Sequence, residues 1–232
     1  MTAQLTPEAS KFIAELTKQL SQKSDPELDS EVPTSHVLRE WIGYLHHNKL
    51  TGGCDHFLDG IRSLLMEGLI CVASGVKRSS ILSMRGQIDL SLSWLYYKDH
   101  SVEWDKVERE NEGYKLKSEV FKYLEFYIPH FSKRMNGLTS NCARETVEPY
   151  KVLSSHIHSM GLNVIPSISS YADILDGSSR QQLYQLQADV CEYISDLFMS
   201  YFASDWAALP NGIVHYYKTR LGQQDFAKVI GS

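Results

Sequence analysis

The sequence predicts an all-α fold, arranged as an antiparallel bundle of about six to eight helices. Two observations support this prediction. Apolar residues recur at steps of three and four along most of the chain, and such steps place them on one face of a helix. In addition, no long stretch alternates between polar and apolar residues with the period of two that is typical of a half-buried strand.

The longest apolar pattern lies between residues 57 and 97, which contain no proline. It runs through Phe57, Ile61, Leu65, Leu69, Val72 and Val76 and continues through Ile81, Met84, Ile88, Leu92 and Leu95. A single helix over this stretch would be roughly 60 Å long, too long for a compact domain of this size. Gly75 and the polar residues 77–80 therefore predict a break, giving two helices or one kinked helix.

The N-terminal part of the chain predicts one helix followed by a loop. Thr6, Pro7 and Glu8 have the hydroxyl, proline and acid that are typical of a helix start. The apolar face of this helix is formed by Phe12, Ile13, Leu16 and Leu20. Residues 21–34 are polar and contain two prolines, so we expect residues 1–34 to form an N-terminal helical arm and linker.

Residues 35–205 are expected to form the core of the bundle. Within them, the polar stretch 98–113 is interpreted as a connection in which Val102 and Trp104 fold back onto the core. Helical spacing resumes over residues 114–131.

The second half of the chain predicts a loop and three further helical segments. Residues 132–145 are interpreted as a basic, flexible loop, and a short helix follows from Pro149. Ser178 and Gln181 match a capping box that opens the last long helix. Residues 206–232 are expected to form a C-terminal helical extension.

Composition excludes several classes of function. The formal net charge of −5 gives no global positive field for DNA or an anionic membrane, so neither is expected as a partner. The four cysteines form no CxxC pair, which favours reduced thiols and a cytoplasmic protein. No apolar run approaches the roughly 18 residues of a spanning helix. The dinucleotide fingerprint, the phosphate loop and zinc-site spacings are absent, so we expect no cofactor and no metal.

Arg85 and Asp89 are candidate binding residues inside the central apolar stretch. Their i,i+4 spacing places opposite charges on one helical face. One interpretation is a structural ion pair, since an unpaired buried ion costs several kcal/mol. The other is an arginine that recognises an anion and is held in place by its aspartate.

Tyr150, Ser154 and His158 share a face of the short helix that starts at Pro149. A phenol, a hydroxyl and an imidazole together could bind phosphate or transfer a proton near neutral pH. The alternative is that His158 bonds a neighbouring helix and contributes to packing.

Arg39 and His46 satisfy the loose R-x4–6-H pattern of helical ribonucleases. Such a pair would polarise a scissile phosphate and move the proton of a ribose hydroxyl without a metal. The pattern is short and arises often by chance.

Trp94 and Trp104 belong to an aromatic group that also contains Tyr96 and Tyr97. The simplest interpretation places these rings in the core and at its rim. On the surface, they would instead form the anchor of an interface.

Two segments carry a family resemblance. The run SSILSMRGQIDLSLSWLYY, which contains Arg85 and Asp89, resembles the arginine–acid helix of a group of bacterial helical proteins. The run YKVLSSHIHS resembles a later helix of the same group, with Tyr150, Ser154 and His158 in a Y-x-x-L-S-x-x-x-H pattern. Over about residues 57–200 the chain thus resembles the HEPN superfamily of helical bundles, which are found in toxin–antitoxin, abortive-infection and other antiviral systems.

This resemblance implies a HEPN-like core and two functions. We expect a non-enzymatic interaction or regulatory subunit of a bacterial multi-component system, with antiviral defence as the implied setting. Its partner would be a protein from the same operon, a second copy of the chain, or both. The alternative is a metal-independent ribonuclease that uses His158 with Arg85, or Arg39 with His46 as a second choice. RNA binding through the basic segment Lys133–Arg144 is a further possibility.

Overall fold

The computed structural model describes residues 7–21, 34–48, 52–160, 164, 174 and 180–231. Every regular element among them is a helix, which confirms the all-α prediction. They form ten α-helices, more than expected, because two stretches predicted as connections also fold into helices. The α-helices are α1 Pro7–Ser21, α3 Ser35–Asn48, α4 His56–Ala73, α5 Lys77–Tyr97, α6 Ser101–Glu110, α7 Lys117–Tyr127, α8 Phe131–Ser140, α9 Pro149–Ile157, α10 Arg180–Phe202 and α11 Asn211–Ile230. Two short 3-10 helices, η1 Gly52–Cys54 and η5 Ala203–Ala208, complete the elements.

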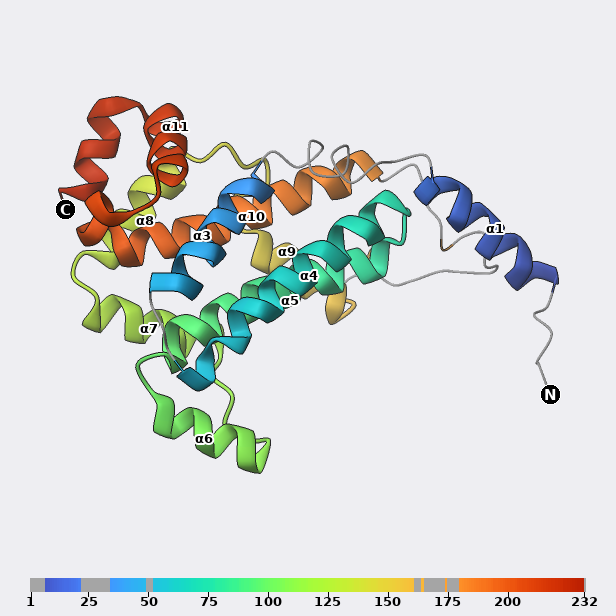
Figure 1. The fold of residues 1–232 in the computed structure, drawn as a ribbon, viewed down its shortest axis with the longest axis horizontal. Helices are drawn as coiled ribbons and strands as arrows, with labels where there is room; N and C mark the ends of the chain where they lie inside the picture. Colours follow the sequence, from blue (N-terminus) through green and yellow to red (C-terminus); the bar gives the residue numbers. More distant parts are fainter. Residues whose placement is uncertain are drawn as a thin grey trace.

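The long apolar pattern forms two helices, α4 and α5, which run antiparallel beside each other (Figure 1). The turn between them contains Gly75, whose φ of +74° lies in the left-handed region. Glycine adopts this conformation without the steric cost that a Cβ brings. The predicted break between residues 75 and 80 is therefore confirmed, as two helices.

Glycines let α4 and α5 approach closely. A Cβ at Gly60 would lie 2.7 Å from the Leu90 side chain, and a Cβ at Gly86 would lie 2.7 Å from the Leu64 side chain. Each helix therefore accommodates a leucine of the other above a glycine. A larger residue at either position would require the facing leucine side chain to shift.

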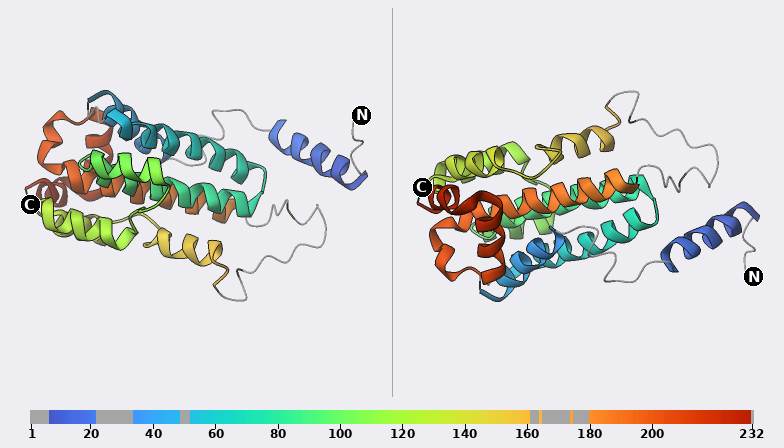
Figure 2. Two further views of the ribbon diagram at one scale, coloured as in Figure 1. Left: turned by 90° about the horizontal axis from the view of Figure 1, so that it is seen from below. Right: turned by 90° about the horizontal axis from the view of Figure 1, so that it is seen from above.

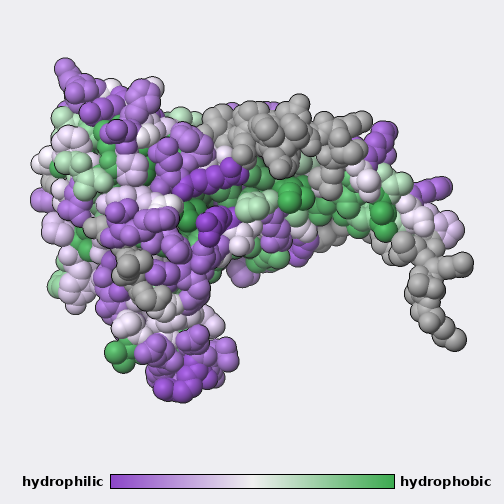
Figure 3. All heavy atoms as spheres, viewed as in Figure 1, coloured by the Kyte–Doolittle hydropathy of each residue, from purple (hydrophilic) through white to green (hydrophobic). Residues whose placement is uncertain are grey.

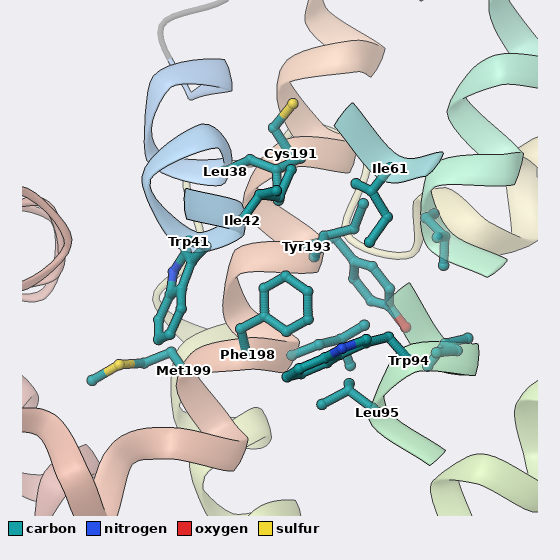
Figure 4. Packing of buried hydrophobic residues seen from close by; sticks show 14 of the residues in the cluster. Leu38, Trp41, Ile42, Ile61, Trp94, Leu95, Cys191, Tyr193, Phe198 and Met199 are labelled. Carbon is teal, nitrogen blue, oxygen red and sulfur yellow. The ribbon is translucent and has the colours of Figure 1, made fainter. Parts of the chain in front are cut away.

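Helix α10 passes through the middle of the bundle, beside α3, α4 and α5 (Figures 1 and 2). Its residues from 190 to 200 are all buried. Trp41 of α3 and Trp94 of α5 lie 5.8 and 5.9 Å from the ring of Phe198, measured between ring centroids (Figure 4). The aromatic core thus joins α3 and α5 to α10.

A pair of buried amides joins α5 to α10. Gln187 Nε2 donates to Gln87 Oε1 at 2.9 Å, and Gln87 Nε2 donates to Gln187 Oε1 at 3.2 Å. Gln87 Nε2 also lies 3.2 Å from the carbonyl oxygen of Leu64 in α4. Because buried amides are costly when unpaired, this reciprocal pair fixes how the two helices are aligned.

Two arginines and two acids are buried together where α10, α11 and the segment 141–148 meet. Arg144 Nη1 lies 3.4 Å from Glu192 Oε1 and 2.5 Å from Asp196 Oδ2. Arg220 reaches the same two carboxylates, at 3.1 and 2.9 Å. The hydroxyls of Tyr216 and Tyr217 donate to Glu192 and Asp196. Equal numbers of positive and negative groups make this burial tolerable.

The prediction of a basic, flexible loop over residues 132–145 is wrong. Its first part belongs to α8, and both Arg134 and Arg144 are buried. Arg134 Nη2 donates to Ser204 Oγ at 3.0 Å, while Arg144 joins the buried acids of α10. These arginines therefore hold the core together, and the positive surface expected for RNA is reduced to Lys133.

The stretch 98–113 is also more ordered than predicted, since it contains α6. Trp104 is buried against Phe57 and Tyr97, which confirms that it folds back onto the core. Val102 does not, because it lies on the exposed face of α6.

The two ends of the chain differ in how they pack. Helix α1 projects from one end of the bundle (Figures 1 and 2), where it contacts α4, and none of its residues whose burial is described is buried. Helix α11 packs against α8 and α3 and buries Ile213, Tyr217 and Phe226. The predicted boundaries at residues 34 and 205 stay predictions, and the predicted helix caps at Thr6 and Ser178 lie outside the described residues. Across the described helices, none combines the length and apolar character needed to cross a membrane.

Replacing Gly68 with alanine should destabilise the fold. A Cβ there would lie 2.8 Å from Gln187 Oε1 and 3.2 Å from Gln87 Nε2, so it would displace the amide pair. We expect a loss of about 1–3 kcal/mol in the free energy of unfolding, measured by urea denaturation. Gly43→Ala is the matched control, because nothing lies within 4 Å of a Cβ at that exposed position of α3. It should stabilise by about 0.5–1 kcal/mol, and similar effects of the two substitutions would contradict the amide-pair assignment.

Removing one cation from the buried charge network should be far more damaging. Arg220→Met leaves Glu192 and Asp196 with a single arginine between them, and we expect a loss of about 3–5 kcal/mol. Lys228→Met, on the same helix, removes an exposed ion pair with Asp225 and should cost less than about 1 kcal/mol. Thermal unfolding followed by circular dichroism measures both losses. A loss for Arg220→Met as small as that for Lys228→Met would contradict a stabilising role for this buried network.

Candidate functional site

Arg85 lies at the centre of a polar cluster between α5 and α9. Its side chain is 13% exposed. Nε donates to Ser154 Oγ at 3.2 Å, Nη2 donates to the Tyr150 hydroxyl at 2.6 Å, and Nη1 forms an ion pair with Asp89. The guanidinium carbon also lies 3.8 Å from the centre of the Tyr150 ring. The structure thus brings together two groups that the sequence predicted separately.

The local helix geometry explains this meeting. Asp89 follows Arg85 by one helical turn on α5, and Ser154 follows Tyr150 by one turn on α9, so each pair faces the same way. Burial raises the pKa of Tyr150, while the positive charge of Arg85 acts in the opposite direction. Tyr150 therefore stays a neutral phenol that accepts a hydrogen bond from Arg85.

His158 lies outside this cluster. It is the first residue after α9 and is exposed, and its backbone N–H donates to the Ser154 carbonyl at 3.0 Å. The side chains bonded to Arg85 in the described structure are those of Asp89, Tyr150 and Ser154. The predicted partnership of Arg85 and His158 is therefore not assembled, although Tyr150 and Ser154 do share the predicted face.

Arg39 and His46 lie on α3, two helical turns or roughly 10 Å apart along its axis. His46 Nε2 lies 3.7 Å from Asp59 Oδ2 of α4. Arg39 is close enough to Cys191 of α10 to act on the pKa of that thiol, which burial raises to about 12. The structure thus places His46 beside α4 and the charge of Arg39 within electrostatic reach of α10.

The two candidate tryptophans are core residues in this structure. Trp94 is fully buried against Phe198 and Phe202, and Trp104 is buried against Phe57. Neither ring is displayed where a partner could reach it.

Lys117, the first residue of α7, was not identified from the sequence. Its ammonium lies 3.3 Å from Glu148 Oε2 and 4.5 Å from the centre of the Tyr150 ring. The rings of Phe121 and Tyr193 are 5.2 and 5.4 Å away. Burial lowers the pKa of Lys117, and the charge of Arg85 adds to this, while Glu148 opposes both. Nothing in the spacing of a single sequence relates Lys117 to residues 31 or more positions away.

A shallow pocket of about 370 Å³ lies beside these cations. It is lined by Leu116, Lys117, Ser118, Phe121 and Tyr150. Its walls are mainly apolar, and Lys117 is the charged group on them. No histidine lines it, and the described residues hold no group of three or more His, Cys, Asp or Glu side chains that could bind a metal. The arrangement can hold an anion beside Lys117.

A series of aromatic side chains runs from the core to the surface; we name it the aromatic ledge and define it as Tyr96, His100, Tyr123, Phe126 and Tyr127, of which Tyr96 is buried. Tyr96 stacks on His100 with ring centroids 4.1 Å apart, and Tyr123 lies 5.2 Å from Tyr127. Phe126 extends the series at 4.8 Å from Tyr127. At its outer end, Phe126 is 81% exposed and Tyr127 is 64% exposed.

Further apolar side chains are exposed elsewhere, including Met66 and Ile70 of α4 and Leu82 of α5. On the face shown in Figure 3, hydrophobic surface forms a band across the middle of the molecule. The projection that contains α6 is mostly hydrophilic in the same view. The surface therefore offers more than one apolar area, of which the ledge is the most aromatic.

Replacing Ser154 with alanine should cost more stability than the same change one residue later. Ser154→Ala leaves Arg85 Nε without its acceptor, and an unpaired buried donor costs about 1–3 kcal/mol. Ser155 donates only to the carbonyl of Val152 within its own helix, so Ser155→Ala should stay within about 0.5 kcal/mol. Urea denaturation of both variants tests this, and equal midpoints would show that the bond to Ser154 contributes nothing.

Comparison of the chain with protein-family models, with curated proteins and with solved structures found no match. The resemblance of residues 57–200 to HEPN proteins therefore stays a proposal that rests on the residue patterns alone.

Proposed function

We propose that this chain is a non-enzymatic helical interaction subunit of a bacterial multi-component system. It would act by presenting a fixed surface to a second copy of the chain or to a protein encoded beside it. The setting in antiviral defence is part of the proposal and comes from the resemblance to HEPN proteins.

The observation that carries this proposal is the aromatic ledge. Soluble proteins seldom leave large aromatic side chains exposed next to one another, and contiguous exposed apolar groups mark interaction surfaces. Phe126 and Tyr127 are exposed and lie against each other. Tyr127 also lies against Tyr123, which is half-buried and donates a hydrogen bond to Asp99 at 2.8 Å. A rigid base with projecting rings matches the anchor residues of protein interfaces.

The state of Arg85 supports a role without catalysis. A guanidinium that stabilises a transition state needs donors directed at the developing charge. Three of the nitrogen atoms of Arg85 are already directed at Asp89, Tyr150 and Ser154. With His158 exposed at the end of α9, the ribonuclease alternative would require both groups to rearrange.

The ledge should be required for association. We expect the purified chain, alone or co-expressed with the products of neighbouring genes, to elute with a mass above the 26.4 kDa of one chain when measured by light scattering. Phe126→Ser with Tyr127→Ser should restore the monomer mass and change the free energy of unfolding by less than about 0.5 kcal/mol, because both side chains are exposed. Leu82→Ser, which changes an exposed side chain of α5, is the control that should leave the larger mass unchanged.

Two results would overturn this proposal. One is a strictly monomeric chain that associates with none of the neighbouring gene products. The other is cleavage of total RNA in the presence of EDTA that His158→Ala abolishes, because this would establish the metal-independent ribonuclease.

A further inference from the structure

The side chains that line the pocket beside Arg85 indicate what kind of ligand it could bind. The rings of Phe121 and Tyr150, together with Leu116, give it apolar walls, and Lys117 places one positive charge among them. Its volume of about 370 Å³ falls within the range of small-ligand pockets. An apolar group with one negative charge would fill it.

The charges around the pocket limit how negative such a ligand can be. Arg85 is already paired with Asp89, which leaves Lys117 as the cation available at the wall. Lys117 faces one anion, Glu148, at 3.3 Å. A ligand with two negative charges would meet Asp89 and Glu148 with only one cation to offset it, whereas a single negative charge can replace Glu148.

Glu148 is placed so that it can be replaced. Its side chain is 54% exposed, while that of Lys117 is 23% exposed. Moving the Glu148 carboxylate into water therefore costs little, because surface ion pairs are worth about 0–1 kcal/mol. Lys117 cannot follow it into water as readily, since three aromatic rings surround its ammonium.

We propose that this pocket binds a carboxylate attached to an apolar group, with the carboxylate on Lys117 in place of Glu148 and the apolar group against Phe121 and Tyr150. A free organic acid and the C-terminal carboxylate of a peptide that ends in an apolar residue share this chemistry. The pocket lies at the other end of α7 from Phe126 and Tyr127, so the proposal goes beyond the interaction role and does not depend on it.

The test uses the full chain, labelled with ¹⁵N, and two acids with neutral counterparts. The free acid is 3-phenylpropionate and its counterpart is 3-phenylpropionamide. The peptide is N-acetyl-Gly-Gly-Phe with a free C-terminus, and its counterpart is the C-terminal amide. We expect amide shifts around residues 116–121 with a dissociation constant on the order of 1 mM for an acid, and binding about tenfold weaker for its neutral counterpart.

Variants distinguish a built site from general attraction. Lys117→Met should weaken acid binding about tenfold, while Lys122→Met, an exposed lysine on the same helix, should leave it unchanged. Glu148→Gln should tighten binding several-fold, because it removes the competing carboxylate. Glu148→Gln therefore tests the proposal even if Lys117→Met fails to fold.

The outcomes separate the two sources of ligand. Binding of the peptide acid in preference to 3-phenylpropionate identifies a chain end, and the reverse preference identifies a free acid. Equal binding of acids and amides, or weaker binding by Glu148→Gln, overturns the proposal. If the chain associates through the aromatic ledge but binds neither acid, only the ligand proposal is overturned. The failures of the two proposals are therefore distinguishable.

Discussion

The amide pair between Gln87 and Gln187 determines how the two central helices meet. It lies within the core, where an unpaired amide would cost about 1–3 kcal/mol, so α5 and α10 are held in the one alignment that pairs both groups. Gly68 provides the space that the pair needs. Arg85 lies two residues before Gln87, and its position against α9 depends on this alignment.

The buried charge network extends this constraint to the other side of the site. Acids of α10 bind the segment that leads into α9: Ala143 N–H donates to Glu192, and Thr146 N–H donates to Asp189 at 2.8 Å. The segment ends at Glu148, directly before Pro149 and Tyr150. The same helix that fixes α5 through an amide pair therefore fixes the start of α9 through carboxylates. Arg85 and Tyr150 meet because α10 holds in place both the helix that carries Arg85 and the segment that leads to Tyr150.

Sequence reasoning found the local parts of this arrangement and missed the distant ones. The break near Gly75 and the pairing of Arg85 with Asp89 depend on spacing within one helix, and the structure contains both. The shared face of Tyr150 and Ser154 was also predicted, but their contact with Arg85, 65 and 69 residues away, was not. For Arg144 the sequence instead predicted an exposed charge, whereas the structure buries and pairs it. It was assigned to a basic loop because its acidic partners lie 48 and 52 residues later, where no local pattern points to them.

The role of Arg85 also depends on contacts with a distant segment that its local sequence pattern does not reveal. As an isolated helical arginine it suggests anion recognition, and its charge is still felt by Lys117, whose pKa it lowers. Its donors, however, are directed at protein groups, and one of them is the hydroxyl of the tyrosine that forms a wall of the neighbouring pocket. Arg85 therefore positions Tyr150, and Lys117 is the cation left to meet a ligand. The patterns in the sequence point to Arg85 on α5 and Tyr150 on α9 but not to Lys117 on α7, because burial and pairing between distant segments decide which positive charge remains available.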